Sequence, residues 1–467
     1  MSFFSIGAPR TENYTLGADG VDHRVELGDV TNPTHLMQAR SVACLTMKSQ
    51  LTATASGYSV AAHVPTLGGH YNLAPGENFA DQQMLGGGTA FLVGNKRYVL
   101  TAGHCLFDKR TGNRLNEKDF RLVFDFAVTN GSTKTDFDAG SVYKVKRVVG
   151  FEFKHSNPNK TSDWALLELD RDVEGREPLE MHFHRRPSEG KSVHMWGHPS
   201  GLPMKFAEHA EIQSRATSPA LPDTRFPTSL NAFSGNSGSP VFNSATNKVL
   251  GILVSGPIDL RTGHDYSRQA DGKMKPYKTD RPTNCQSLRN LLVVEKYLQA
   301  VEAIGDLEGK DLAKVQEKVG QWIARGKHGL CKSESLATKF FKQAAKNGDK
   351  HRALQLGYYY KCKGKEEKAF KYTMLGAKAG CKDAQYKVGK WLYYGKYTEE
   401  NEEKGLCWLH KSAQKGGIWA IQMLGNVDPD WEDAPPPVKP LDSSKSRWES
   451  LNPCYWINRA ASYISSS

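Results

Sequence analysis

Residues 231–241 read Asn231-Ala-Phe-Ser-Gly-Asn-Ser-Gly-Ser-Pro-Val241, a run of small and turn-forming residues that leads into an apolar strand. Glycines at positions 235 and 238 admit backbone angles that a side chain forbids. Ser237 can therefore stand at a tight turn, with neighbouring backbone N–H groups directed beside its hydroxyl. The N–H groups of Gly235 and Ser237 are candidates for an oxyanion hole, which stabilises the negative oxygen of a tetrahedral intermediate. Taken alone, the loop is equally consistent with a plain Gly/Ser connection between two strands.

Two residues upstream supply what a nucleophilic serine needs, a general base and an acid that orients the base. His104 follows a predicted strand and a small-residue turn, and Asp163 opens an apolar stretch that ends at position 169. Alone, each residue is more often structural. The chain order histidine, aspartate, serine within one strand-rich region predicts a catalytic triad of His104, Asp163 and Ser237.

Hydrophobic periodicity separates the chain into two kinds of structure. Short alternating or apolar runs, divided by Gly and Pro turns, predict strands at 41–47, 89–93, 98–104, 120–125, 141–149, 163–169, 192–197, 241–242 and 249–254. No helical pattern interrupts them, which favours an all-β barrel or sandwich. From Leu288 onward the apolar residues recur at helical spacing instead.

The helical part contains an internal repeat. A glycine in a similar helical context recurs at positions 320, 357, 389 and 425, and an Ala-x-x-Gly element ends at 348, 380 and 416. The two landmarks keep step, which indicates helical repeat units that bury their apolar faces by stacking on one another. Chance similarity among Lys/Ala/Gly-rich helices is the alternative. Small residues at these places would let two helices approach closely.

These patterns predict five segments: an N-terminal arm (1–38), a strand-rich domain (39–287), a connecting helix (288–309), helical repeats (310–426) and a Pro-containing tail (427–467). The formal charge of the 467 residues is +12. Residues 308–425 hold 24 Lys and Arg against 12 Asp and Glu, so the rest of the chain is balanced. A basic repeat region favours an acidic protein partner; nucleic acid is less favoured because no RNA-binding signature is present. The simplest alternative is that the lysines only solvate the outer face.

The sequence predicts neither a membrane span nor a cofactor. No apolar run reaches membrane-helix length, and the start lacks a secretory signal. The eight cysteines are scattered without CxxC pairs, so we expect free thiols and no zinc cluster. We therefore expect a cytoplasmic protein, with delivery into a host cell by a specialised secretion route as an alternative. No metal site is predicted, because His182 and His184 lack a third ligand.

Three segments together resemble the signature segments of chymotrypsin-fold serine peptidases, and most nearly the glutamyl-endopeptidase-like branch. They are Thr101-Ala-Gly-His-Cys105, Asp163-Trp-Ala-Leu-Leu-Glu-Leu169 and Gly235-Asn-Ser-Gly-Ser-Pro240. Asp22-His-Arg-Val25 and Trp196-Gly-His-Pro-Ser-Gly201 are similar to further segments of that branch. The resemblance covers roughly residues 20–300. It implies a double six-stranded β-barrel with the triad in the cleft between the barrels.

The helical part, residues 310–425, resembles Sel-one-like repeats, a branch of the tetratricopeptide-type solenoids. That resemblance implies a curved surface that binds another protein.

The sequence departs from the peptidase family in two ways. Asn236 stands where trypsin-like zymogens carry an aspartate that receives a new amino terminus, so we expect no switch of the trypsinogen type. Cys105 has no cysteine at the matching place in residues 88–92, so the usual loop disulfide is not expected.

Spacing from Ser237 also places candidate substrate-pocket residues. Asn231 falls near the base of the primary pocket, and Leu253 takes the place of the pocket histidine of glutamate-specific relatives. Together with Ser255 and Gly256, they predict a pocket for a neutral or apolar side chain rather than for Arg, Lys or Glu.

The leading hypothesis is a serine endopeptidase that cleaves protein substrates through an acyl-enzyme, with basic repeats that recruit a substrate or regulator. The main alternative is a latent or inactive peptidase-like scaffold that only binds proteins. A nucleic-acid-directed protease is a third, weaker hypothesis.

Overall fold

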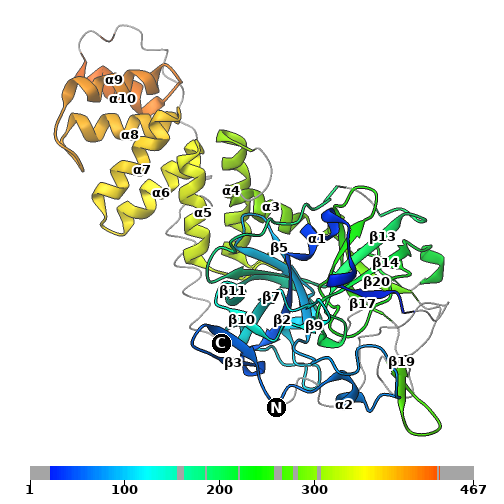
Figure 1. The fold of residues 1–467 in the computed structure, drawn as a ribbon. Coiled ribbons are helices and arrows are strands. Elements are labelled where there is room, and N and C mark those ends of the chain that lie inside the picture. The colour runs from blue at the N-terminus through cyan, green and yellow to red at the C-terminus, as the bar shows by residue number, and fades with distance from the viewer. Residues whose placement is uncertain are drawn as a thin grey trace. The chain divides into compact units, whose positions relative to one another are not determined.

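The computed structural model describes residues 22–154, 162–184, 187–218, 221–256, 266–276, 282–301, 307–428 and 431. The chain divides into two compact units (Figure 1). The β unit comprises residues up to Glu295 together with His328–Cys331, and the helical unit comprises Lys296–Lys327 and everything from Lys332 onward. The division thus falls inside the predicted connecting helix 288–309, and a four-residue segment of the predicted repeat region belongs to the β unit.

A closed six-stranded barrel forms the first half of the β unit, with the strand order β11-β12-β6-β5-β2-β7. Its strands are β2 (Val42–Met47), β5 (Gly88–Val93), β6 (Tyr98–Thr101), β7 (Phe120–Phe124), β11 (Val142–Glu152) and β12 (Trp164–Leu169). All six residues of β12 are buried. Its one charged side chain, Glu168, is held by Lys146 and Arg147 of the adjacent strand β11, so no buried charge is left uncompensated.

The second half of the β unit is a seven-stranded sheet with the order β1-β14-β13-β16-β17-β20-β15. Its strands are β1 (Arg24–Glu26), β13 (Ser192–Gly197), β14 (Lys205–Glu211), β15 (Arg225–Thr228), β16 (Pro240–Asn243), β17 (Val249–Ser255) and β20 (Thr283–Ser287). Ile212, directly after β14, bridges to Thr228 of β15, so the sheet curls back on itself. The prediction of six strands per barrel is confirmed for the first barrel. The second sheet has a seventh strand because β1, from the predicted arm, pairs with β14.

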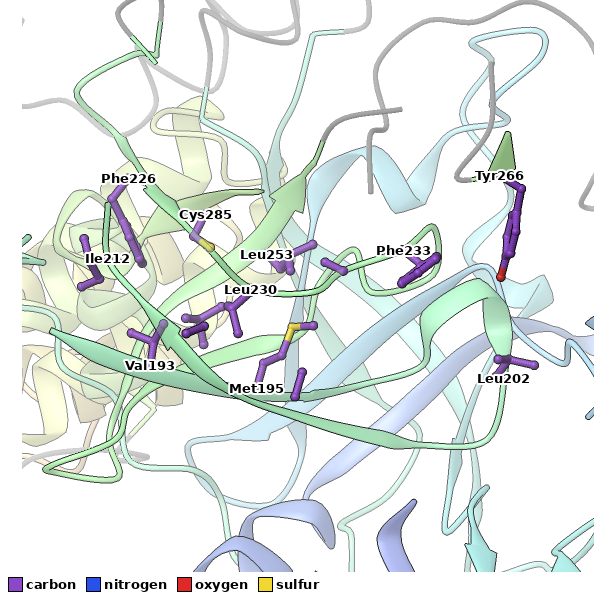
Figure 2. Close-up of a cluster of buried hydrophobic side chains, with 14 of the residues drawn as sticks. Val193, Met195, Leu202, Ile212, Phe226, Leu230, Phe233, Leu253, Tyr266 and Cys285 are labelled. Atoms are coloured by element: carbon purple, nitrogen blue, oxygen red, sulfur yellow. The ribbon is translucent and has the colours of Figure 1, made fainter. Parts of the chain in front are cut away.

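A cluster of buried apolar side chains forms the core of this second sheet (Figure 2). It draws on strands and on the loops between them, and includes Val193, Met195, Leu202, Ile212, Phe226, Leu230, Phe233, Leu253, Tyr266 and Cys285. Because Phe233 belongs to this core, the loop that follows it toward Ser237 starts from a fixed point.

Shorter elements complete the β unit. They are β3 (Leu51–Ala53), β4 (Gly57–Val60), β8 (Val128–Thr129), β9 (Ser132–Thr133), β10 (Asp136–Asp138), β18 (Tyr266–Arg268), β19 (Met274–Pro276), α1 (Pro33–Ala39) and α2 (Leu67–Tyr71). Helix α1 was not predicted, although it has a standard start: Asn32 caps it by accepting a hydrogen bond from the N–H of Thr34, and Pro33 occupies the first turn.

One segment from the predicted repeat region pairs with the first barrel. The N–H of Phe151 donates to the carbonyl of Gly329, and the N–H of Cys331 donates to the carbonyl of Val149. Leu330 between them is 3% exposed. Residues 328–331 therefore extend the sheet beside β11.

The helical unit is made of consecutive helices, as predicted. They are α4 (Gly309–Arg325), α5 (Glu334–Lys346), α6 (Lys350–Cys362), α7 (Glu366–Lys378), α8 (Lys382–Tyr393), α9 (Glu402–Ala413) and α10 (Ile418–Val427). Helix α3 (Leu292–Ala300) precedes them and spans the division between the units.

Three of the four landmark glycines lie where helices meet, and the fourth, Gly425, has open space beside it. A Cβ at Gly320 would stand 2.5 Å from the Phe341 ring, and one at Gly357 would stand 2.1 Å from Thr373 Oγ1. At Gly389 it would stand 2.8 Å from Leu409. The prediction of close helix approach is confirmed at these three positions. The other landmark ends helices: the glycines at 348, 380 and 416 follow α5, α7 and α9 with positive φ.

Candidate active site

His104 lies in a single 3-10 turn, Gly103–Leu106, directly after strand β6. Its side chain is 7% exposed, and its Nδ1 lies 2.7 Å from Oδ2 of Asp163. The backbone N–H of His104 donates to the other carboxylate oxygen, Oδ1, at 3.0 Å. Both oxygens of one carboxylate therefore fix the position of this imidazole, and the Nδ1 contact leaves Nε2 as the nitrogen that can act as a base.

Asp163 immediately precedes the buried strand β12 and is 3% exposed. Two residues of the second sheet hold it. Its backbone N–H donates to Oε1 of Gln286 at 3.1 Å, and Nη2 of Arg225 lies 3.9 Å from its Oδ2. Asp163 is thus the point at which the first barrel meets strands β15 and β20.

Sequence reasoning missed both Arg225 and Gln286. Arg225 is 3% exposed and Gln286 is fully buried. Burial lowers the pKa of Arg225, and the nearby Asp163 carboxylate opposes that effect. Neither residue stands in a motif, and the strands that carry them were not predicted, so no signal in the sequence marked them.

The loop that carries Ser237 is built by its two glycines. Gly235 has a φ of +92° and Gly238 a φ of +94°, both in the left-handed region. A Cβ on Gly238 would stand 1.9 Å from the carbonyl of Thr89, and one on Gly235 would stand 2.4 Å from the carbonyl of His198. Only glycine fits both the backbone angles and the close contacts at these positions.

Thr89 of β5 ties this loop to the first barrel. Its N–H donates to the carbonyl of Ser237 at 2.8 Å, and its Oγ1 donates to the carbonyl of Gly235 at 2.8 Å. Cys105, the residue after His104, has its Sγ 3.7 Å from the Ser237 carbonyl. The main chain of Ser237 therefore lies beside the His104 turn. Ser237 itself is 0% exposed.

Asn236, next to Ser237, is 1% exposed, and its side-chain nitrogen and oxygen have no hydrogen-bond partner among the described residues. Its amide packs instead against Gly197, where a Cβ would stand 2.4 Å from Oδ1. The absence of a trypsinogen-type switch remains a prediction based on this neutral side chain.

The predicted substrate-pocket residues are all buried: Asn231 is 4% exposed, Leu253 0% and Ser255 8%. Leu253 lies in the core of the second sheet, in the same cluster as Phe233 (Figure 2). Its carbonyl accepts the N–H of Gly238, which ties it to the Ser237 loop. Gly256 ends the described part of this strand and is buried. Leu253 thus contacts the loop directly, and the role of the four residues in choosing a substrate remains a prediction.

The segment Asp22–Val25 reaches the same loop. Arg24 is 5% exposed, makes two 2.7 Å hydrogen bonds to Asp22, and lies 3.8 Å from the centre of the Phe233 ring. Burial raises the pKa of Asp22, but the Arg24 guanidinium outweighs burial, so the pKa lies below its usual value. A buried ion pair thus covers the start of the Ser237 loop.

Other predicted features are placed as follows. The seven described cysteines have free thiols. Nε2 of His184 lies 2.9 Å from Glu295, and no group of three or more His, Cys, Asp or Glu within the described ranges is arranged to hold a metal. Of the helices that the structure describes, none combines the length and apolarity that a bilayer crossing requires.

Comparison with known proteins matches this region to one family. Residues 88–252 match the family model of the trypsin-like peptidase domain. No curated relative matches the chain.

Among the solved structures to which the chain is similar are two serine peptidases and one repeat protein. A serine endoprotease from Yersinia pestis is 14% identical, over 58% of this chain and 68% of that one, with a TM-score of 0.32. A Glu endopeptidase is 12% identical, over 59% of this chain and 95% of that one, with a TM-score of 0.33. A Sel1 repeat protein from Oxalobacter formigenes is 26% identical, over 31% of this chain and 61% of that one, with a TM-score of 0.25. The family match of residues 88–252 and the chain's own elements together identify a trypsin-like peptidase domain with a chymotrypsin-type β fold, followed by a helical-repeat unit.

Proposed function

We propose that the protein is a serine endopeptidase that cleaves protein substrates through an acyl-enzyme. The observation that carries the proposal is the 2.7 Å contact between His104 and Asp163, made inside a domain of the trypsin-like peptidase family. In this mechanism Ser237 Oγ attacks the scissile carbonyl, and His104 takes its proton and passes it to the leaving amine. Asp163 keeps the proton on Nδ1 of His104 and stabilises the imidazolium that forms.

The backbone N–H groups of Gly235 and Ser237 would hold the oxyanion of the tetrahedral intermediate. The hydrogen bonds from Thr89 support this role, because they fix the loop before substrate arrives and so reduce its reorganisation during the reaction. Water then hydrolyses the acyl-enzyme with His104 as base a second time.

The helical unit is proposed to recruit a protein, either the substrate or a regulator. Three large apolar side chains on it are exposed: Tyr394 at 56%, Ile418 at 42% and Trp419 at 63%. Exposed aromatic side chains of this size are common at protein-binding surfaces. Residues 308–425 hold 24 Lys and Arg against 12 Asp and Glu, which favours an acidic peptide as partner.

The test is the full-length protein with Ser237→Ala and, separately, His104→Ala. Each change should abolish peptide hydrolysis, and any remaining rate should be about 10³-fold above the uncatalysed rate or less. Ser239→Ala is the matched control, because Ser239 lies two residues away in the same loop and is equally buried. N-terminomics with active and Ser237→Ala protein would report both activity and cleavage preference.

A second candidate function is a latent peptidase whose site opens only with a partner. The observation that favours it is the 0% exposure of Ser237, since a substrate carbonyl must reach its hydroxyl. Fluorophosphonate labelling of Ser237 separates the two proposals. Labelling of the protein alone supports the constitutive enzyme, and labelling only with the partner present supports latency. No labelling of Ser237 under either condition would overturn both.

A further inference from the structure

A cavity of about 820 Å³ lies on the second sheet, and no role in the proposed reaction uses it. It is bordered by β15, by the end of β20 and by the residues that follow them. Arg225 lines it, and the guanidinium of this residue lies 3.9 Å from Asp163. A ligand in this cavity would therefore be one side chain away from the acid of the proposed triad.

The lining carries polar atoms that a ligand would satisfy. Gln213 Oε1 and Ser287 Oγ are buried and have no hydrogen-bond partner among the described residues. Buried polar atoms without partners are costly, which makes them rare outside sites that hold water or a ligand. Both residues line this cavity, which places the two oxygens within reach of a single ligand.

The cations of the cavity outnumber its anions. Arg215 pairs with Asp223 at 3.2 Å and also bonds backbone carbonyls, and Arg225 faces Asp163. Arg289 is exposed and makes no ion pair with any residue that the structure describes. The remaining charge is Glu189, which is exposed at the rim. The planar guanidinium of Arg289 suits a carboxylate, which it can hold with two parallel hydrogen bonds.

The cavity also has an apolar wall. Phe226 and Pro227 of β15 line it, as does Leu292, whose side chain is 50% exposed. Leucine exposed to this extent beside a cavity offers apolar area to a ligand. A bare inorganic anion would leave this wall in contact with water.

We propose that this cavity binds a carboxylate carried on an apolar group, and that Arg225 communicates its occupancy to Asp163. Such a group occurs in free aryl and alkyl acids and at the C-terminus of a peptide that ends in an apolar residue. An anion near Arg225 offsets its positive charge and makes the electrostatic potential at Asp163 and His104 more negative, which favours the protonated form of His104. The binding part stands without the proposed function, and the communication part rests on it.

Binding is tested by calorimetry on full-length Ser237→Ala protein with 4-phenylbutyrate, its neutral amide, and the tripeptide acetyl-Ala-Ala-Phe with a free carboxylate. The acid should bind about tenfold or more tightly than the amide, as expected of one charge-assisted hydrogen bond. Arg289→Gln should remove that preference, and Glu189→Gln should strengthen it. Arg110→Gln, an exposed arginine outside the cavity lining, is the matched control and should leave the preference unchanged.

The outcomes are distinct. Tighter binding of the tripeptide than of phenylbutyrate identifies a peptide terminus as the source, and the reverse identifies a free acid. Equal binding of acid and amide, no binding of either, or a preference that survives Arg289→Gln would each overturn the proposal.

Communication is tested in the wild-type protein by the rate at which fluorophosphonate labels Ser237, with phenylbutyrate or its amide present. A labelling rate that changes with phenylbutyrate but not with its amide supports the communication. An unchanged labelling rate at a phenylbutyrate concentration that is shown to bind would overturn the communication. If Ser237 never labels while the acid binds, the proposed function and the communication fail, and the binding site stands.

Discussion

The β unit and the helical unit hold their structures together over very different distances along the chain. Asp163 is fixed by His104, 59 residues away, and by Gln286, 123 residues away. In the helical unit, Gly357 meets Thr373 of the next helix, and Gly389 meets Leu409 of the next. Contacts of the first kind make one site from the whole unit. Contacts of the second kind join neighbouring helices only, so the destabilisation caused by a substitution should stay in the helices next to it.

The largest expected effect is that of Gly238→Ala in the β unit. The new Cβ would stand 1.9 Å from the Thr89 carbonyl and 2.3 Å from Thr101 Oγ1, at a φ of +94°. Backbone strain and overpacking together should lower the free energy of unfolding by about 2–5 kcal/mol. Because the same Thr89 positions Ser237, fluorophosphonate labelling should also be lost. Urea unfolding and labelling measure the two effects.

Gly131→Ala is the control for strain alone, since Gly131 has a φ of +73° and nothing within 4 Å of its added Cβ. This variant should lower the free energy of unfolding by about 1 kcal/mol and leave the fluorophosphonate labelling of Ser237 intact. If Gly238→Ala and Gly131→Ala lowered the free energy of unfolding equally, the close contact with Thr89 would not determine the conformation of the loop.

The next effect tests whether damage stays local in the helical unit. Gly357→Ala places a Cβ 2.1 Å from Thr373 Oγ1 and should cost about 1–3 kcal/mol, against the usual gain from alanine in a helix. Hydrogen exchange should show faster opening in α6 and α7, while labelling of Ser237 is unchanged.

Gly425→Ala is matched to this variant, because Gly425 is the same landmark in α10 and its added Cβ meets nothing within 4 Å. It should be neutral or stabilising by up to about 1 kcal/mol. Faster exchange across the whole β unit in Gly357→Ala would contradict the picture of nearest-neighbour coupling.

The last effect is the smallest per pH unit for a single residue: acid should destabilise the β unit through two buried histidines. Burial lowers the pKa of both His194 and His198 to about 3. The unfolded chain takes up these protons first, near pH 6.5, so stability is full above that pH and is lost as the pH falls below it. Each histidine should contribute a slope of about 1.4 kcal/mol per pH unit.

Urea unfolding at several pH values between about 6.5 and 5 measures this slope. His194→Gln should reduce the slope by the contribution of one proton, about 1.4 kcal/mol per pH unit. His35→Gln, at a less buried histidine, should reduce the slope less. A slope that His194→Gln leaves unchanged would show that this histidine does not titrate on unfolding.

The fold class and the repeat were predictable because each rests on a local pattern. Strand alternation, the Gly-rich loop around Ser237 and the spacing of Gly320, Gly357 and Gly389 are visible without knowing what packs against them. The contact between His104 and Asp163 was predicted from residue types and their order, and the 2.7 Å distance agrees with it.

What the sequence could not reveal depends on partners distant in the chain. Arg225 is an ordinary charged residue until the second sheet buries it against Asp163. Strand β1 forms only because β14, far along the chain, offers an edge to pair with. Leu330 lies between two helices in the sequence, and only its bridge to Gly150 of β11 joins it to the first barrel.

The segment His328–Cys331 also determines how the protein can be dissected. The chain enters the helical unit after Glu295, returns to the β unit for these four residues, and leaves again at Lys332. A peptidase fragment cut near residue 300 would lack the chain that hydrogen-bonds Val149 and Phe151 and that covers Trp164, since a Cβ on Gly329 would stand 3.1 Å from its ring. Such a fragment exposes an unpaired strand edge, which is a template for aggregation. The smallest self-sufficient form of the peptidase domain therefore extends through Cys331 and includes helix α4.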